Sequence, residues 1–158
     1  PLVNVATGVS FIATANIGTE YTSTRILDRA LMDRFEVIEV DILSKERELV
    51  LLQKRFGKIV EDSLLDSVAD IADVTRNEWR SEEGKLSTMI STRMTVRICE
   101  LLADGFTLEE ASEVGILPFF DASGGADSER LFVKQVIQKH LGTADENIFN
   151  IKEEGVVE

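Results

Sequence analysis

The sequence predicts an α/β segment followed by an all-α domain. Two apolar runs near the N-terminus, residues 9–15 and 35–42, have the composition of buried strands, and the chain beyond them places apolar residues at helical spacing. Three parts follow from this change of pattern: residues 1–43 with the two strands, residues 44–142 with about five helices, and an acidic tail over residues 143–158. The expected architecture is a small piece of sheet joined to a helical bundle.

Both predicted strands are apolar on two faces. The run Val9–Ala15 shows no polar alternation and lies between Gly8 and the turn-forming Asn16, and residues 35–42 place apolar side chains on either side of the strand. A polar loop and a short helix over residues 26–32 separate the two runs. Two strands do not form a stable sheet alone, so we expect their partner strands to come from outside this chain.

Five helices are predicted from capping residues and apolar spacing. The first begins after Ser44 and ends at Gly57, and the second runs through residues 64–79. The other three begin at Ser91 or Thr92, at Thr107 and at Ser128. Thr107 and Glu110 have the spacing of a capping box, in which each side chain satisfies a free backbone N–H of the other residue.

Composition excludes several classes of function. The formal net charge of −12 and the isoelectric point near 4.6 argue against nucleic acid and other acidic partners, because binding to phosphates depends on Lys and Arg. One cysteine, Cys99, and one histidine, His140, offer no cluster with metal-ligand spacing and no internal disulfide. No apolar run approaches the ~20 residues of a membrane span. We therefore expect a soluble, cytoplasmic protein without a metal site.

Three strings carry a resemblance to a known family. FIATAN at residues 11–16, LDRALMDRF at residues 27–35 and STRMTV at residues 91–96 resemble motifs of AAA+ ATPases of the MoxR and cobaltochelatase-ATPase type. In that family the first is a core strand ending in a polar sensor, the second an arginine-finger element, and the third the start of a lid helix. The resemblance implies the C-terminal half of an AAA+ module, with residues 44–142 as its helical lid.

The resemblance also implies roles for individual residues. Asn16 would contact the attacking water or the γ-phosphate of ATP, and Arg34 would be the arginine finger offered to a neighbouring subunit. Arg25 and Arg29 remain open as rivals for that role. From the residues alone, Asn16 is equally a turn residue after a strand and Arg34 a surface cation.

Two arginines on the third predicted helix form a further candidate site. Arg93 and Arg97 are four residues apart and share one helix face. The resemblance gives Arg93 a nucleotide-sensing role from the lid, with Arg97 in support. The alternative is a pair of solvated arginines near Glu100.

The chain lacks the residues that bind phosphate. Gly57-Lys58 and Gly84-Lys85 are the nearest strings to a P-loop, and both lack its earlier glycine and its Ser or Thr. Asp41 is followed by Ile42 rather than by the Glu of a magnesium-binding strand. The implied ATP and Mg²⁺ would thus be bound mainly by residues outside this chain, and the chain alone is predicted to be inactive as an ATPase.

The resemblance implies several protein partners. These are the N-terminal half of the AAA+ core, neighbouring subunits in a ring, with a hexamer as the expected form, and a protein with a von Willebrand A domain. The client of such a motor is not identified by any residue here.

Two alternatives belong to other classes of function. Residues 107–116 have the look of the first helix and turn of a helix-turn-helix protein, but Leu117-Pro118-Phe119 follows where a basic recognition helix would be needed. The stronger alternative is a non-catalytic, acidic helical interaction module whose arginines are structural and whose acidic surface docks a basic partner protein.

Overall fold

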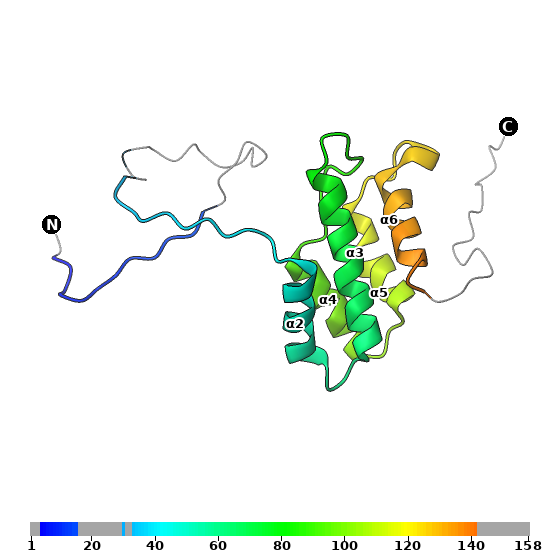
Figure 1. Cartoon of the computed structure of the whole chain (residues 1–158), viewed down its shortest axis with the longest axis horizontal. Coiled ribbons are helices and arrows are strands. Elements are labelled where there is room, and N and C mark those ends of the chain that lie inside the picture. The colour runs from blue at the N-terminus through cyan, green and yellow to red at the C-terminus, as the bar shows by residue number, and fades with distance from the viewer. Residues whose placement is uncertain (1–3, 16–29, 31–32, 142–158) are drawn as a thin grey trace. The chain divides into compact units, whose positions relative to one another are not determined.

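The computed structural model describes residues 4–15, 30 and 33–141, and the regular structure within them is entirely helical. The chain divides into two compact units, Pro1–Val40 and Asp41–Glu158. The second unit contains the helices α2 (Lys45–Phe56), α3 (Asp62–Arg80), α4 (Thr92–Ala103), α5 (Leu108–Gly115) and α6 (Glu129–Gln138), with 3₁₀ turns η1 (Leu117–Phe119) and η2 (Gly125–Asp127) (Figure 1).

Local capping chemistry sets the helix ends. Ser44 precedes α2 and Gly57 follows it, as the sequence predicts. The hydroxyl groups of Ser91 and Ser128 accept hydrogen bonds from the third residues of α4 and α6. Thr107 forms the predicted capping box at the start of α5. Each of these bonds satisfies a backbone N–H that has no partner inside its helix, which is why these residues begin helices.

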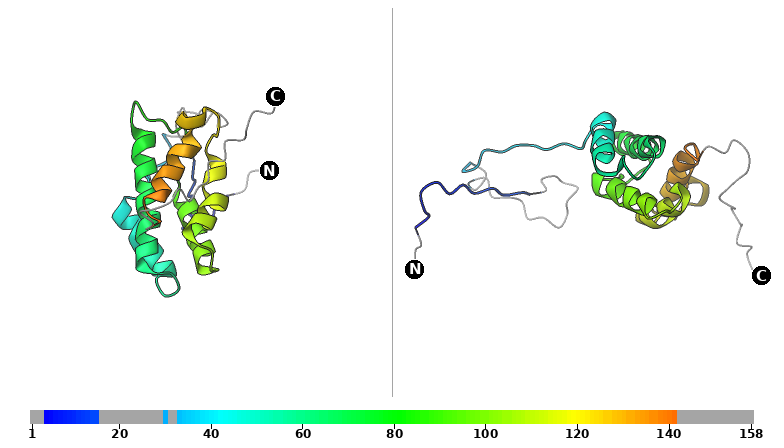
Figure 2. Two further views of the ribbon diagram at one scale, coloured as in Figure 1. Left: turned by 90° about the vertical axis from the view of Figure 1, so that its right-hand side faces the viewer. Right: turned by 90° about the horizontal axis from the view of Figure 1, so that it is seen from below.

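The longest helix, α3, lies at the centre of the bundle. It packs against α2, α4 and α6, while α5 packs against α4 and η1 (Figures 1 and 2). In Figure 1 and in the right view of Figure 2, α2 lies at one side of the bundle, and α5 and α6 lie at the other. Gly115 allows α5 to approach α4 closely, because a Cβ atom there would lie 2.6 Å from Cδ1 of Ile98.

One continuous apolar core joins the helices. Its side chains come from every α-helix of the second unit and from η1, so no helix is peripheral to it. The members that are at most 1% exposed are Leu52, Leu65, Ala69, Ile71, Ala72, Ile90, Ile98, Cys99, Ala111, Phe120, Val133 and Ile137. Burial of this kind contributes roughly 25 cal/mol per Å² of apolar surface, so packing rather than helix propensity stabilises these short helices.

The prediction of two strands is wrong. Residues 9–15 and 35–42 have no regular secondary structure, and their apolar side chains are exposed, Ile12 by 93% and Val40 by 90%. A strand exists only when a second strand receives its backbone N–H and C=O groups. No other strand is present in the part of the chain that the structure describes, so an apolar composition alone does not produce one here.

This finding also corrects the fold class and the family resemblance. An AAA+ module of the MoxR and cobaltochelatase type is built on a parallel sheet, whereas residues 4–15, 30 and 33–141 contain only helices. The resemblance rested on three short strings, and matches of that length need only a few coinciding residues. The prediction that this chain is the C-terminal half of such an ATPase is therefore wrong.

Two other predictions concern residues outside the described ranges. The helix predicted over residues 26–32 lies outside them apart from Ala30, which is helical, and the acidic tail over residues 143–158 lies wholly outside them. Within the described ranges, no helix combines the length and the apolar content that crossing a bilayer requires.

Candidate protein-interaction surface

A buried ion pair lies between α2, α3 and α4. Glu48 from α2 is 0% exposed and Arg76 from α3 is 2% exposed, and Nη1 of Arg76 lies 3.2 Å from Oε2 of Glu48. The hydroxyl of Thr92 donates to the same carboxylate at 2.8 Å, and the hydroxyl of Thr95 donates to its other oxygen. Both threonines belong to α4, so one carboxylate gathers hydrogen bonds from two neighbouring helices.

Arg76 completes this network with backbone acceptors. Its Nε donates to the carbonyl of Ile90 at 2.9 Å, and Nη1 also donates to the carbonyl of Leu43 at 3.1 Å. The guanidinium therefore fixes the segments that lead into α2 and α4. Burying a charge is energetically costly unless the charge is paired and hydrogen-bonded, and this pair meets both conditions. We assign it to the architecture of the bundle, not to catalysis.

This network was not identified from the sequence. A signal was present in the spacing. Glu48, Leu52 and Phe56 recur every four residues, and Arg76 follows Ala72 by four, so both charged residues lie on the apolar faces of their helices. Charged residues at two such positions, of opposite sign, indicate a buried pair.

A second cluster of charges surrounds Asp70 on α3. Nζ of Lys45 lies 2.7 Å from Asp70 and 3.7 Å from Asp66, and Nε2 of His140 lies 3.4 Å from the other oxygen of Asp70. The hydrogen bond with Asp70 raises the pKa of Lys45. Asp66 and Asp70 of α3 are therefore partnered within the bundle. His140 lies two residues after α6 and joins that end of the bundle to this cluster.

The residues predicted to sense nucleotide are not brought together by the described structure. Asn16, Arg25 and Arg29 lie outside the described residues. Arg34 is exposed, and its guanidinium donates to the backbone carbonyl of Ala30. The arginine-finger and ATP-sensing roles came with the family resemblance, and they lose their basis because the described residues form helices and no sheet.

Arg93 and Arg97 are both exposed on α4. Nη1 of Arg97 lies 3.5 Å from Oε2 of Glu100, the surface pair that the sequence left open as an alternative. Arg93 makes no hydrogen bond or ion pair within the described residues. The binding of ATP and Mg²⁺, the ring of subunits and the von Willebrand A-domain partner stay predictions, and their basis was the same resemblance.

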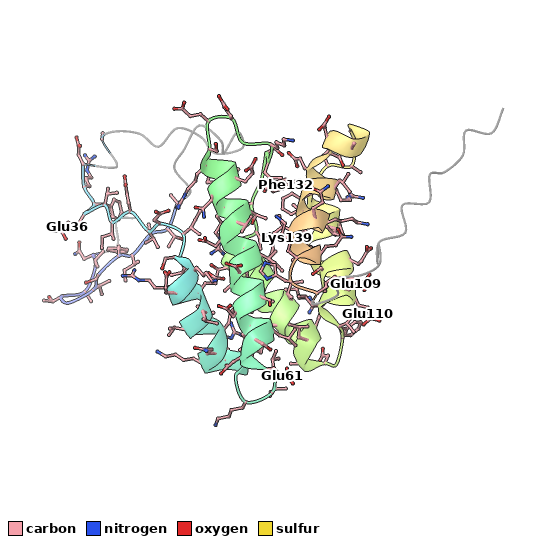
Figure 3. All side chains as sticks on the ribbon, turned by 45° about the vertical axis from the view of Figure 1, so that its right-hand side comes forward. Glu36, Glu61, Glu109, Glu110, Phe132 and Lys139 are labelled. Carbon is pink, nitrogen blue, oxygen red and sulfur yellow. The ribbon has the colours of Figure 1, made fainter. Side chains whose placement is uncertain are left out.

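The outer face of α5 is acidic. Glu109, Glu110 and Glu113 lie on the side of this helix opposite to its buried residues, and α5 contains no Lys or Arg. Figure 3 shows Glu109 and Glu110 projecting from α5 away from the bundle. Glu110 also serves the capping box, and hydrogen bonds from the Thr107 backbone N–H and hydroxyl lower the pKa of its carboxyl. Glu113 lies 3.3 Å from Nζ of Lys134.

Apolar side chains are exposed beside these carboxylates. Phe106 is 45% exposed, Val114 is 64% exposed and Phe119, in the η1 turn that packs on α5, is 62% exposed. Because helix positions four apart are neighbours, Val114 lies next to Glu110 on the outer face. We call Phe106, Glu109, Glu110, Glu113, Val114 and Phe119 the α5 surface. It combines negative charge with apolar area, as protein-interaction surfaces do.

No cluster of His, Cys, Asp and Glu among the described residues has the arrangement of a metal site. The thiol of Cys99 is buried, and burial raises its pKa to about 12, which removes it from thiolate chemistry at neutral pH.

No family model matches the sequence. The chain is 39% identical over 110 residues to the putative chaperone BssE of Thauera aromatica, a match that covers 70% of this chain and 36% of that protein. The chain thus spans about a third of the length of this curated relative.

Proposed function

We propose that the second unit is a non-catalytic protein-interaction module, and that the α5 surface docks a basic, partly apolar segment of a partner protein. The observation that carries the proposal is the outer face of α5, where three carboxylates flank the exposed Val114 without a cation in the same helix. Negative charge steers a basic partner toward the surface, and the apolar side chains hold it there.

Structural roles account for only part of this surface. Glu109 and Glu110 lie in the first turn of α5, where carboxylates favour the helix dipole, and Glu110 caps the helix. Neither role requires Val114 or Phe119 to be exposed next to them. Exposed apolar side chains beside like charges favour contact with another protein over simple solvation.

The similarity to a putative chaperone supports the same class of function. A chaperone acts by binding other proteins, and a surface of mixed apolar and charged character is suited to that task. Because the match spans about a third of that relative, the chaperone activity of a whole protein is part of the proposal and not a property assigned to this chain alone.

A synthetic helical peptide tests the proposal. Lys and Leu occupy its positions i, i+3, i+4 and i+7 in turn, so that both face the same side of the helix. We expect the chain to bind it in a fluorescence anisotropy titration, and the double variant Glu109→Gln/Glu113→Gln to weaken binding about tenfold, with a further loss in Val114→Ser. These substitutions leave Glu110 and its capping box in place. Unchanged affinity in all three variants would contradict the proposal.

A matched control removes two carboxylates elsewhere. Glu82 and Glu83 are exposed in the segment between α3 and α4, so Glu82→Gln/Glu83→Gln changes the net charge by the same amount without touching α5. We expect this control to bind the Lys/Leu peptide as tightly as the unmodified chain. An equal loss in the control would show that net charge, and not the α5 surface, governs binding.

A further inference from the structure

The outer face of α2 carries the opposite charge to the protein as a whole. Between Lys45 and Lys58 the sequence contains five Lys and Arg residues and two Glu residues, in a chain of net charge −12. One of the two, Glu48, is buried in its ion pair. The other, Glu46, is occupied at the start of α2, where its own backbone N–H and the Ser44 side chain lower the pKa of its carboxyl.

The cations form a stripe with apolar residues at its centre. Arg47, Val50, Leu51 and Lys54 follow the spacing i, i+3, i+4 and i+7, which places them along one side of α2, and Lys58 follows two residues after the helix ends at Phe56. Arg47, Lys54 and Lys58 are exposed and Val50 is 49% exposed, while Leu51 is half-buried. We call these five residues the α2 stripe. At ~1.5 Å per residue its helical part, from Arg47 to Lys54, is about 10 Å long.

The cations of the stripe are unpaired. Within the described residues, Arg47, Lys54 and Lys58 make no ion pair or side-chain hydrogen bond, although the second unit is rich in carboxylates. The helix dipole explains Lys54, which lies in the last turn of α2. It does not explain Arg47, since the first turn of a helix disfavours a cation.

We propose that the α2 stripe docks an acidic segment of a partner protein, with carboxylates on Arg47, Lys54 and Lys58 and an apolar side chain on Val50 and Leu51. This surface lies on the other side of the bundle from α5 (Figures 1 and 2) and takes a partner of opposite charge, so it goes beyond the proposed function.

Charge and composition favour a protein segment over other anions. The net charge of −12 disfavours acidic partners for the chain as a whole, so a ligand of this locally basic stripe must add apolar contact to its negative charge. The apolar centre of the stripe has no counterpart along a phosphate backbone. An amphipathic acidic helix of about two turns matches both the length and the alternation of charge and apolar area.

A labelled helical peptide with Glu and Leu in the corresponding positions is the probe. We expect the full chain to bind it, the double variant Arg47→Gln/Lys54→Gln to weaken binding about tenfold, and Val50→Ser to weaken it several-fold. Lys85→Gln/Lys139→Gln is the matched control, since both lysines are exposed and lie outside α2, and it should bind as the unmodified chain does. Binding should weaken as salt concentration rises.

Competing occupants give different results. Two other anionic ligands are tested, a single-stranded oligonucleotide and vesicles of phosphatidylserine and phosphatidylcholine. The proposal would be overturned if the chain bound either of them more tightly than the peptide and Val50→Ser bound it equally well. Self-association of the chain, measured by sedimentation, would also overturn the proposal if both Arg47→Gln/Lys54→Gln and Glu109→Gln/Glu113→Gln abolished it. The occupant of the stripe would then be a second copy of the chain. If the Glu/Leu peptide does not bind at low salt concentration, the proposal for the α2 stripe is wrong. That outcome does not affect the test of the α5 surface with the Lys/Leu peptide.

Discussion

Arg76→Leu tests whether the buried ion pair holds the bundle together. The substitution leaves the carboxylate of Glu48, which is 0% exposed, without its cation, and it removes the hydrogen-bond donors to the carbonyls of Ile90 and Leu43. Removing one partner of a buried pair costs about 3–5 kcal/mol of folding free energy. The hydroxyl groups of Thr92 and Thr95 remain on the carboxylate, so we expect a loss near the lower end of that range.

Urea denaturation, followed by far-ultraviolet circular dichroism and by the fluorescence of the single tryptophan, Trp79, measures this loss. The free energy of unfolding of a domain is only about 5–15 kcal/mol, so the variant should unfold at a much lower urea concentration or fail to fold. Trp79 is three residues from Arg76 on α3 and reports on the same helix. Agreement between the two signals tests whether the transition is two-state.

Two further variants separate the effect of the ion pair on stability from the effect of side-chain size. Arg80→Leu makes the same change on the same helix, but the Arg80 pair with Asp41 is exposed, so we expect a change within about 0.5 kcal/mol. Glu48→Leu/Arg76→Leu removes both charges and should recover most of the loss, because no isolated charge stays buried. If Arg76→Leu costs no more than Arg80→Leu, the pair does not organise α2, α3 and α4 as argued here.

Three smaller predictions follow from single sites. Cys99, with its buried thiol and a pKa raised to about 12, should react with iodoacetamide at pH 8 only after unfolding; rapid labelling of the native chain would contradict its burial. Thr107→Ala should cost about 1 kcal/mol through the loss of the capping box, measured by thermal melting, whereas Thr88→Ala in the loop before α4 serves as a control without a cap. For Glu129, burial raises the pKa, but hydrogen bonds from Ser87 and from the Asp121 backbone N–H outweigh burial and lower the pKa below 4.5. A carboxyl group whose pKa is lowered in the folded state stabilises the fold at pH values above its pKa in the unfolded state, and this stabilisation is lost as the pH falls through its pKa in the folded state. Glu129→Gln should therefore be less stable than the unmodified chain at pH 7, and the difference should disappear in acid.

The helix boundaries could be predicted from the sequence because their causes are local. Ser44, Ser91, Thr107 and Ser128 each bond to a backbone N–H within three residues or occupy the position where such a bond forms, and Gly57 ends α2. Apolar residues at helical spacing identified the faces that enter the core. None of these features depends on a distant part of the chain.

The strands could not be predicted in the same way. Residues 9–15 and 35–42 are apolar enough for a covered sheet, yet a strand depends on hydrogen bonds to a neighbouring strand. The composition of a segment indicates whether it is apolar enough for a buried strand, but not whether another strand is available to pair with it. The family resemblance failed for a related reason, since short strings match without the sheet that gives them their role.

The sequence by itself determined where the helices of the second unit begin and end, which side of each is apolar, and that the chain is strongly acidic. Only the tertiary structure decided which charges meet. Glu48 and Arg76 are 28 residues apart, and Lys45 meets His140 across Asp70, because α3 packs between α2 and α6. Among the residues that the structure describes, the same packing brings no carboxylate to Arg47 or Lys54, since ion pairs depend on distances between helices that spacing within one helix does not contain.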